Sequence, residues 1–250
     1  MNQINQMNQV LPGDEDVFKV SYVRLRIMTG IVGILLPFVL IIGKWIFESW
    51  GIQSSISAYY YTVMRNFFVG GLFAIGVFFI SNRIGRPDFK RDNIASALAG
   101  FFAICVALLP TTPATNVTMT NRWIGNFHLL SAGCFFGILS YISLKLFTKT
   151  NKTNLKLHQY HRKRWRNRIY QTCGIIMIVC IVSILLVQIL PDNASIKRYD
   201  PVFWLETGAI LAFGVAWIYK SGAILRHKNN RAQRILKSVL LVDEETVLNK

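Results

Sequence analysis

The stretch GIVGILLPFVLIIG, residues 30–43, decides the class of this protein. It contains no charged residue and lies within an apolar run that extends from about residue 27 to about residue 47. An apolar run of about 20 residues is long enough to cross the hydrocarbon core of a bilayer as a helix. The sequence therefore predicts a membrane-spanning helix in this region.

Five further apolar runs follow, at about 66–82, 93–109, 123–147, 169–190 and 202–219. The chain has 250 residues, of which 52% are hydrophobic and only 16% are charged, whereas a soluble domain carries about 25% charged residues. The six runs use nearly half of the chain and leave short loops between them. We therefore predict an all-α fold, a polytopic bundle of six transmembrane helices.

The basic residues give this bundle an orientation. Of the 28 Lys and Arg residues, 23 fall in the two tails, in the second and fourth loops and at the ends of the runs beside them, and 5 fall on the opposite side. Short cytoplasmic loops carry the excess of Lys and Arg. We therefore expect a cytoplasmic tail at 1–26, the membrane domain at 27–221 and a cytoplasmic tail at 222–250. Apolar residues near helical spacing predict an amphipathic helix in the second tail.

Composition also bounds the kinds of partner. The formal net charge of +16 could indicate nucleic-acid binding, but the basic residues lie beside the spans, where membrane insertion explains them. We therefore expect membrane lipids as partners and no nucleic acid. The cysteines form no C-x-x-C pair, and His128 is the one histidine within a predicted span. We therefore predict no metal site and no cofactor.

Two patterns of small residues predict close helix packing. Ser96 and Gly100 are four positions apart in the third run, and Gly133 and Gly137 form a G-x-x-x-G in the fourth. Small residues at this spacing let two helix backbones approach closely. We expect a tight helix contact at each pair.

Polar groups at membrane depth cost free energy, so each is a candidate for function. In this chain nearly all of them lie towards the outer ends of the spans. The residues that we predict to line an outward-facing, ligand-binding pocket are Tyr59, Tyr60, Arg65, Asn66, Arg122, Asn126, His128 and Glu206. Glu206 lies in the first turns of the sixth run, where a carboxylate needs a partner, and we expect that partner to be Arg65 or Arg122.

Other interpretations of these residues remain open. The three tyrosines at 59–61 also suit an aromatic belt at the membrane interface, and the Pro/Thr-rich third loop could cover a pocket. Asn126 and His128 should lie about 200° apart around a helix, so we do not expect both to face one pocket. Ser55 or Ser57, His128 and Glu206 supply the residue types of a serine hydrolase, although no G-x-S-x-G motif is present.

Three segments carry a resemblance to a known family: SISAYYYTVMRNFFVGGLFAIGVFF (55–79), RKRWRNRIYQTCG (162–174) and FWLETGAILAFGVAW (203–217). They resemble a family of uncharacterised bacterial six-helix membrane proteins, over about residues 20–222. The resemblance implies the fold and a location in the bacterial inner membrane, and no reaction. The segments contain Tyr59, Tyr60, Arg65, Asn66, Arg166, Asn167 and Glu206. The chain lacks the histidine motifs of the ceramidase and adiponectin-receptor-like hydrolases.

From these observations we expect a non-enzymatic membrane protein whose outward-facing polar pocket binds a lipid head group or a small molecule. One alternative is an intramembrane hydrolase of lipid-like substrates that uses His128 and Glu206. Another is a small-molecule transporter, which would need polar groups that continue into the cytoplasmic half of the spans. Oligomeric state is not specified by the sequence.

Overall fold

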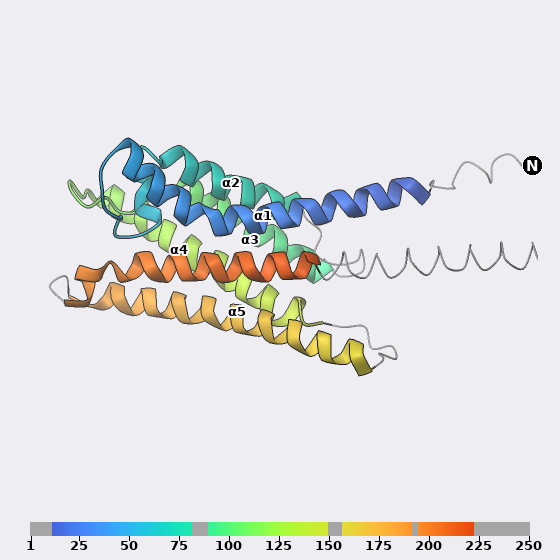
Figure 1. Cartoon of the computed structure of the whole chain (residues 1–250). Helices are drawn as coiled ribbons and strands as arrows, with labels where there is room; N and C mark the ends of the chain where they lie inside the picture. Colours follow the sequence, from blue (N-terminus) through green and yellow to red (C-terminus); the bar gives the residue numbers. More distant parts are fainter. Residues whose placement is uncertain (1–11, 82–89, 150–156, 192–194, 223–250) are drawn as a thin grey trace, which may run out of the picture.

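The computed structural model describes residues 12–81, 90–149, 157–191 and 195–222 (Figure 1). These residues form helices and connecting loops, and no strand occurs among them. The elements are α1 (Pro12–Phe47), the 3-10 helix η2 (Ser57–Tyr61), α2 (Arg65–Ser81), α3 (Lys90–Leu108), α4 (Met119–Tyr141), the π-helical turn η3 (Ile142–Leu146), α5 (Leu157–Ile189), the 3-10 helix η4 (Ser195–Tyr199) and a last helix, Pro201–Gly222. The all-α prediction is confirmed.

The long helices run side by side along one direction of the bundle (Figure 1). At one end, which we call the loop end, residues 48–64 and 109–118 connect the helices. At the other end, which we call the terminus end, α1 begins and the last helix finishes. Buried polar side chains lie towards both ends of this bundle.

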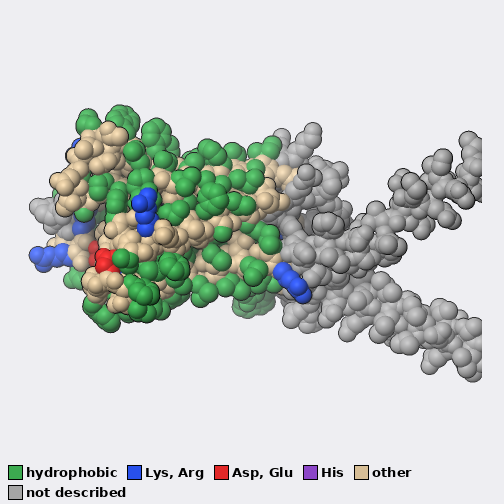
Figure 2. Space-filling model, turned by 90° about the horizontal axis from the view of Figure 1, so that it is seen from above, with side chains coloured by type: hydrophobic (Ala, Val, Ile, Leu, Met, Phe, Trp, Pro, Cys, Tyr) green, Lys and Arg blue, Asp and Glu red, His purple; other side chains and the backbone are tan. Residues whose placement is uncertain are grey.

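Four helical segments are long and apolar enough to cross a membrane: Arg24–Phe47, Met119–Leu146, Lys163–Ile189 and Pro201–Gly222. Two further apolar helices, Arg65–Ser81 and Asn93–Leu108, are shorter. Hydrophobic side chains cover most of the face in Figure 2, and the few charged ones lie towards its ends. Because a soluble protein would bury such side chains, the chain is a multi-pass membrane protein.

Two helices extend beyond the apolar runs that predicted them. α1 begins at Pro12, within the predicted tail 1–26, and α5 begins at Leu157, twelve residues before the predicted span at 169. Hydrogen bonds within a helix satisfy its backbone in water as well as in lipid, and Arg, Lys and Gln favour helix. Hydropathy therefore marks where the apolar part begins, and not where the helix begins. The predicted amphipathic helix at 222–250 lies outside the described residues.

The helices α2 and α3 approach closely where Gly76 faces Gly100. A Cβ atom built on Gly100 would lie 2.5 Å from the carbonyl oxygen of Gly76. Four residues earlier on α3, the Ser96 hydroxyl donates a hydrogen bond of 2.8 Å to the Phe79 carbonyl oxygen of α2. The predicted contact at Ser96 and Gly100 is therefore confirmed, and the small residues bring the two backbones together.

The other predicted glycine contact is wrong. Cβ atoms built on Gly133 and Gly137 of α4 would meet no described atom within 4 Å. A second close crossing instead joins α1 to the last helix, where a Cβ on Gly214 would lie 2.8 Å from the carbonyl oxygen of Gly30. Because Gly30 and Gly214 belong to different runs, their pairing follows from the packing of the bundle and leaves no local pattern.

Candidate functional site

The first connection at the loop end is folded into the bundle. Ile56 is 2% exposed and Tyr59 is fully buried, with its ring 6.5 Å from that of Phe203 in the last helix. The Glu48 carboxylate accepts a hydrogen bond of 3.1 Å from the Val63 main-chain N–H. Residues 48–64 are therefore held in place from two sides, and an interfacial belt does not describe Tyr59.

Glu206 joins this loop to the last helix. Its Oε2 atom accepts hydrogen bonds from the main-chain N–H groups of Ile56, at 2.5 Å, and Ser57, at 3.2 Å. Its Oε1 atom accepts a hydrogen bond of 3.2 Å from the Ser57 hydroxyl. These N–H groups lie at the start of η2, where a helix leaves its donors without internal partners and attracts negative charge. Glu206 thus caps η2 from 150 positions away in the sequence.

The prediction that Glu206 pairs with Arg65 or Arg122 is therefore wrong. The Arg65 guanidinium lies 4.2 Å from the centre of the Tyr60 ring and donates a hydrogen bond of 2.5 Å to the Tyr60 hydroxyl. This contact combines a cation–π interaction with a hydrogen bond at an exposed position. The partners of Glu206 are instead backbone N–H groups. Such groups are present in every loop, whichever residues the loop contains.

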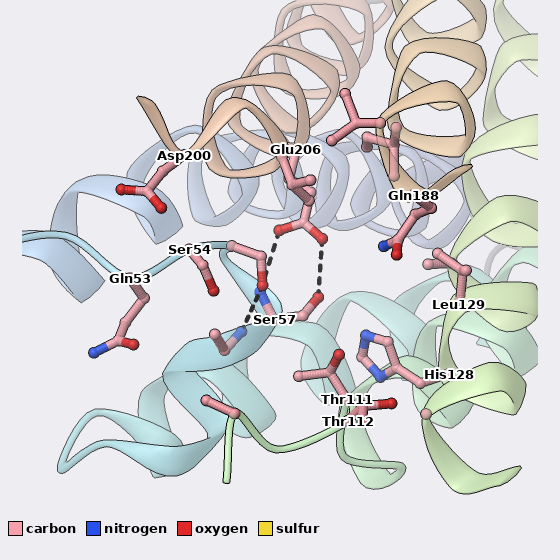
Figure 3. Close-up of a pocket in the computed structure, with 18 of the residues that line it drawn as sticks. Gln53, Ser54, Ser57, Thr111, Thr112, His128, Leu129, Gln188, Asp200 and Glu206 are labelled. Atoms are coloured by element: carbon pink, nitrogen blue, oxygen red, sulfur yellow. Dashed lines mark hydrogen bonds between the residues drawn. The ribbon is translucent and has the colours of Figure 1, made fainter. Parts of the chain in front are cut away.

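A cavity of about 600 Å³ lies beside Glu206 at the loop end (Figure 3). It is enclosed by the first connection, the third connection, the middle of α4, the end of α5 and the start of the last helix. The residues that line it are Gln53, Ser54, Ser55, Ser57, Ala58, Tyr61, Thr111, Thr112, Pro113, Ala114, Thr115, Gly125, Asn126, His128, Leu129, Ala132, Ile184, Val187, Gln188, Lys197, Asp200, Pro201, Val202 and Glu206.

The cavity brings together three of the eight predicted pocket residues: Asn126, His128 and Glu206. The other five, Tyr59, Tyr60, Arg65, Asn66 and Arg122, do not line it. The structure therefore divides the predicted set into a cavity group and a group that packs around or outside the first connection. The Pro/Thr-rich connection does cover the cavity, as the sequence suggested, because Thr111–Thr115 form part of its wall.

His128 is 3% exposed, and Figure 3 shows its ring beside Leu129 and Thr111. Its Nδ1 atom lies 2.6 Å from the carbonyl oxygen of Leu109. A carbonyl oxygen only accepts, so Nδ1 is the donor and the other ring nitrogen, Nε2, carries a lone pair in the neutral ring. Nε2 has no hydrogen-bond partner among the described residues. The cavity wall thus holds a buried acceptor.

Asn126 and His128 both line the cavity, contrary to the expectation from helical spacing. Gly125 gives the physical reason. A Cβ atom on Gly125 would lie 2.0 Å from the Thr112 hydroxyl and 2.8 Å from the Thr112 main-chain nitrogen. The third connection therefore lies directly against α4, and Thr112 and Gly125 both line the cavity at that contact. A helical wheel treats a pocket as one face and does not anticipate this shape.

The walls of the cavity combine polar and apolar side chains. Hydroxyl and amide side chains such as Gln53, Ser54 and Thr111 come from the connections, and apolar side chains such as Ile184 and Val187 come from α5. The charged side chains on the lining are Lys197, Asp200 and Glu206. The described residues contain no group of three His, Cys, Asp or Glu side chains arranged to hold a metal ion.

Sequence reasoning missed most of this lining, including Gln53, Thr111, Lys197 and Asp200. Each is a polar residue in a connection, and connections contain many such residues that face water. The one signal that could have found them is Glu206 itself, because a carboxylate four residues into an apolar run needs donors from a connecting segment.

Tyr61 holds the first and third connections together over the cavity. Its hydroxyl donates a hydrogen bond of 2.6 Å to the carbonyl oxygen of Thr111. Burial raises the pKa of Tyr61 above its ordinary value of 10, and the neighbouring Tyr60 raises it further, whereas Arg65 lowers it. The phenol therefore stays protonated, and remains a donor, throughout the physiological range.

Replacing Tyr61 by Phe should lower the free energy of unfolding by about 1 kcal/mol at pH 8, since one neutral hydrogen bond is lost. A raised pKa in the folded state stabilises the fold fully below pH 10, and this contribution disappears as the pH rises through the raised pKa. The difference between wild type and Y61F should therefore shrink above pH 10, measured by thermal unfolding in detergent. A difference that stays constant up to pH 12 would mean that the phenol is not the donor.

No family model, curated protein or solved structure matches this chain.

Proposed function

We propose that the chain crosses the bacterial cytoplasmic membrane six times, with both termini in the cytoplasm and the cavity on the outer face. The proposal is supported by the charge count, which assigns 23 of 28 Lys and Arg residues to one side. α2 has 17 residues, which give about 25 Å of helix at 1.5 Å per residue. That length approaches the thickness of the hydrocarbon core, and interfacial residues can make up the difference.

We further propose that the cavity binds a small polar molecule or the head group of a lipid from the outer leaflet. The observation that carries this proposal is a cavity of about 600 Å³ whose lining combines polar and apolar side chains. Ligand sites in proteins typically enclose about 300–1,000 Å³ and place a few polar groups on an apolar lining. Such a mixed lining suits an amphiphilic ligand.

The lining favours one class of head group. Among the described residues it contains no arginine, and its charged side chains are one lysine and two carboxylates. Arginine is the usual partner of phosphate and carboxylate groups, and Arg65 and Arg122 lie outside the lining. The cavity therefore suits hydroxyl, amide or ammonium groups better than an anionic phosphate.

Filling the cavity should expel the ligand. Ala132 lines the cavity, so Ala132→Phe would occupy part of its space, and Asn126→Ala would remove a polar group from the wall. We expect a lipid or small molecule to co-purify with the wild type and to be depleted at least tenfold in Ala132→Phe, as measured by mass spectrometry of extracts. Ala97→Phe, at an exposed position on α3, is the matched control.

Equal amounts of the same molecule in the wild type, Ala132→Phe and Asn126→Ala would contradict the proposal.

The alternative of a hydrolase is favoured by one observation, because Ser57, His128 and Glu206 line the same cavity and His128 Nε2 carries the lone pair of a general base. The Ser57 hydroxyl, however, donates to Glu206. Covalent labelling of Ser57 by a fluorophosphonate probe would favour the hydrolase, and absence of labelling would favour binding alone.

A further inference from the structure

The face of α4 that lines the cavity carries one buried polar ring among small or apolar neighbours. The lining residues Gly125, His128, Leu129 and Ala132 lie at positions i, i+3, i+4 and i+7, which share one side of a helix. The three neighbours of His128 on this face have no polar side-chain group, so none of them can bond to its ring. Any hydrogen-bond partner of His128 must come from another segment or from a ligand.

The partner of the Nδ1 atom comes from the segment just past the end of α3. The Leu109 carbonyl oxygen lies 2.6 Å from His128 Nδ1. A helix leaves its last carbonyl groups without internal donors, and Pro113, four positions after Leu109, has no N–H group to offer. The imidazole N–H supplies the missing donor. The fold therefore holds the proton of the neutral ring on Nδ1 and leaves Nε2 as an acceptor.

His128 Nε2 in turn requires a donor. The side chain is 3% exposed, and Nε2 has no partner in the part of the chain that the structure describes. Buried polar groups without partners are rare and costly. Ala132, one turn further along α4, lines the cavity with a methyl group only, so the cavity reaches this part of the helix. A ligand in the cavity is therefore placed to supply the donor that His128 lacks.

The charges on the lining bear on the kind of donor. A desolvated ammonium group needs a carboxylate as its partner. Glu206 already accepts three hydrogen bonds, from Ile56 and Ser57. Figure 3 shows Asp200 on the far side of Glu206 from His128. A neutral donor therefore suits the surroundings of His128 better than a cation does.

The remaining polar groups of the lining match hydroxyl groups. Most of its polar side chains carry a hydroxyl or an amide, and such groups can both donate and accept, as the hydroxyls of a ligand can. The Thr112 hydroxyl lies against Gly125, on the same face of α4 as His128. A ligand with several hydroxyls can therefore donate to His128 and also bond to the walls around it.

We infer that the cavity binds an uncharged polyhydroxylated group, a sugar or a glycerol, and that one of its hydroxyls donates a hydrogen bond to His128 Nε2. This inference rests on the proposed function and names the class of ligand for the same site. The group belongs either to the head of a lipid or to a free sugar. In both cases His128 is the acceptor that orients the bound group.

The test is the thermal unfolding of the full chain in a detergent without a sugar head group, with glucosyl diacylglycerol, diacylglycerol, phosphatidylcholine or glucose added separately. We expect glucosyl diacylglycerol to raise the unfolding temperature more than diacylglycerol or phosphatidylcholine does. Stabilisation by glucose would identify a free sugar as the ligand. Because sugars also stabilise proteins by exclusion from their surface, a glucose effect that persists in Ala132→Phe counts as no binding.

Two replacements of His128 separate ligand binding from structure. Asparagine can place its amide nitrogen near the position of Nδ1, which keeps a donor for Leu109, but it has no atom near Nε2. Glutamine can place its amide oxygen near Nε2, which keeps the acceptor and loses the donor to Leu109. His128→Asn should weaken the apparent affinity for glucosyl diacylglycerol about tenfold, because one hydrogen bond is lost. His128→Gln should keep most of the affinity and unfold at a lower temperature than His128→Asn without ligand.

Ser131→Ala is the matched control, because Ser131 is a buried polar residue of α4 that does not line the cavity. It should bind as the wild type does. The inference is wrong if neither glucosyl diacylglycerol nor glucose stabilises the wild type, or if His128→Asn keeps the affinity of the wild type. A molecule that co-purifies with the wild type and is depleted in Ala132→Phe would still support the proposed function in that case. Equal amounts of every co-purified molecule in both proteins would contradict the proposed function as well.

Discussion

Gly100→Ala should destabilise the bundle by about 3 kcal/mol, at the upper end of what overpacking a close contact costs. The new Cβ atom would lie 2.5 Å from the Gly76 carbonyl oxygen and 2.9 Å from the Ile80 main-chain nitrogen. Both are backbone atoms of α2, so no side-chain rotation relieves the clash. The two helices must separate, and the Ser96 hydrogen bond to α2 lengthens with them. Chemical or thermal unfolding in detergent measures the loss.

Gly133→Ala provides the matched control on α4. Its Cβ atom would meet nothing within 4 Å, and alanine favours helix over glycine by up to about 1 kcal/mol. We therefore expect Gly133→Ala to unfold at the temperature of the wild type or slightly above it. If Gly100→Ala and Gly133→Ala lose the same stability, overpacking of the α2–α3 crossing is not the cause of the loss, and the prediction is wrong.

Glu206→Ala should lower the free energy of unfolding by about 3 kcal/mol, because two main-chain N–H groups at the start of η2 lose their acceptor. The Ser57 hydroxyl loses its acceptor as well. The first connection should detach from the last helix, and the cavity should lose one of its walls. Faster hydrogen exchange over residues 52–64, together with a lower unfolding temperature, would report this detachment.

Glu206→Gln separates the role of the carboxylate charge from that of the hydrogen bonds. Its amide oxygen can still accept from both N–H groups, and its amide nitrogen can donate to the Ser57 hydroxyl. We expect this variant to lose less than half of the stability that Glu206→Ala loses. Asp200→Asn, on the same cavity wall, should be close to neutral. Equal losses in Glu206→Gln and Glu206→Ala would show that the charge matters more than the cap.

Hydropathy predicted the six apolar helices well because the hydropathy of each run depends only on the residues within it. α2 begins at Arg65 and finishes at Ser81, one residue from the predicted 66–82. The terminal parts of α1 and α5 were missed, because a helix continues in water wherever its residues favour helix. The contact at Gly100 was found from local spacing. The same argument failed at Gly133, since spacing does not specify which helix faces it.

The candidate site was likewise predicted from the sequence only in part. Glu206 stands out in the sequence because a carboxylate inside an apolar run requires partners. Its partners are N–H groups that every loop possesses, so no residue type could identify them. Arg65 was a reasonable candidate by charge, but a neighbouring ring at Tyr60 offers it a nearer contact. Arg26 was assigned to a tail, although packing against Trp217 buries it completely.

The sequence by itself determined that this protein is a multi-pass helical bundle, because the transfer of apolar residues into lipid depends on local composition. It also singled out Glu206, His128 and Asn126 as polar groups in need of an explanation. Only the tertiary structure decided which of them share a cavity, which connection Glu206 caps and where the cations meet the aromatic rings. Those contacts join residues as far apart as Ile56 and Glu206, and their free energy depends on the packing of helices that the sequence places far apart along the chain.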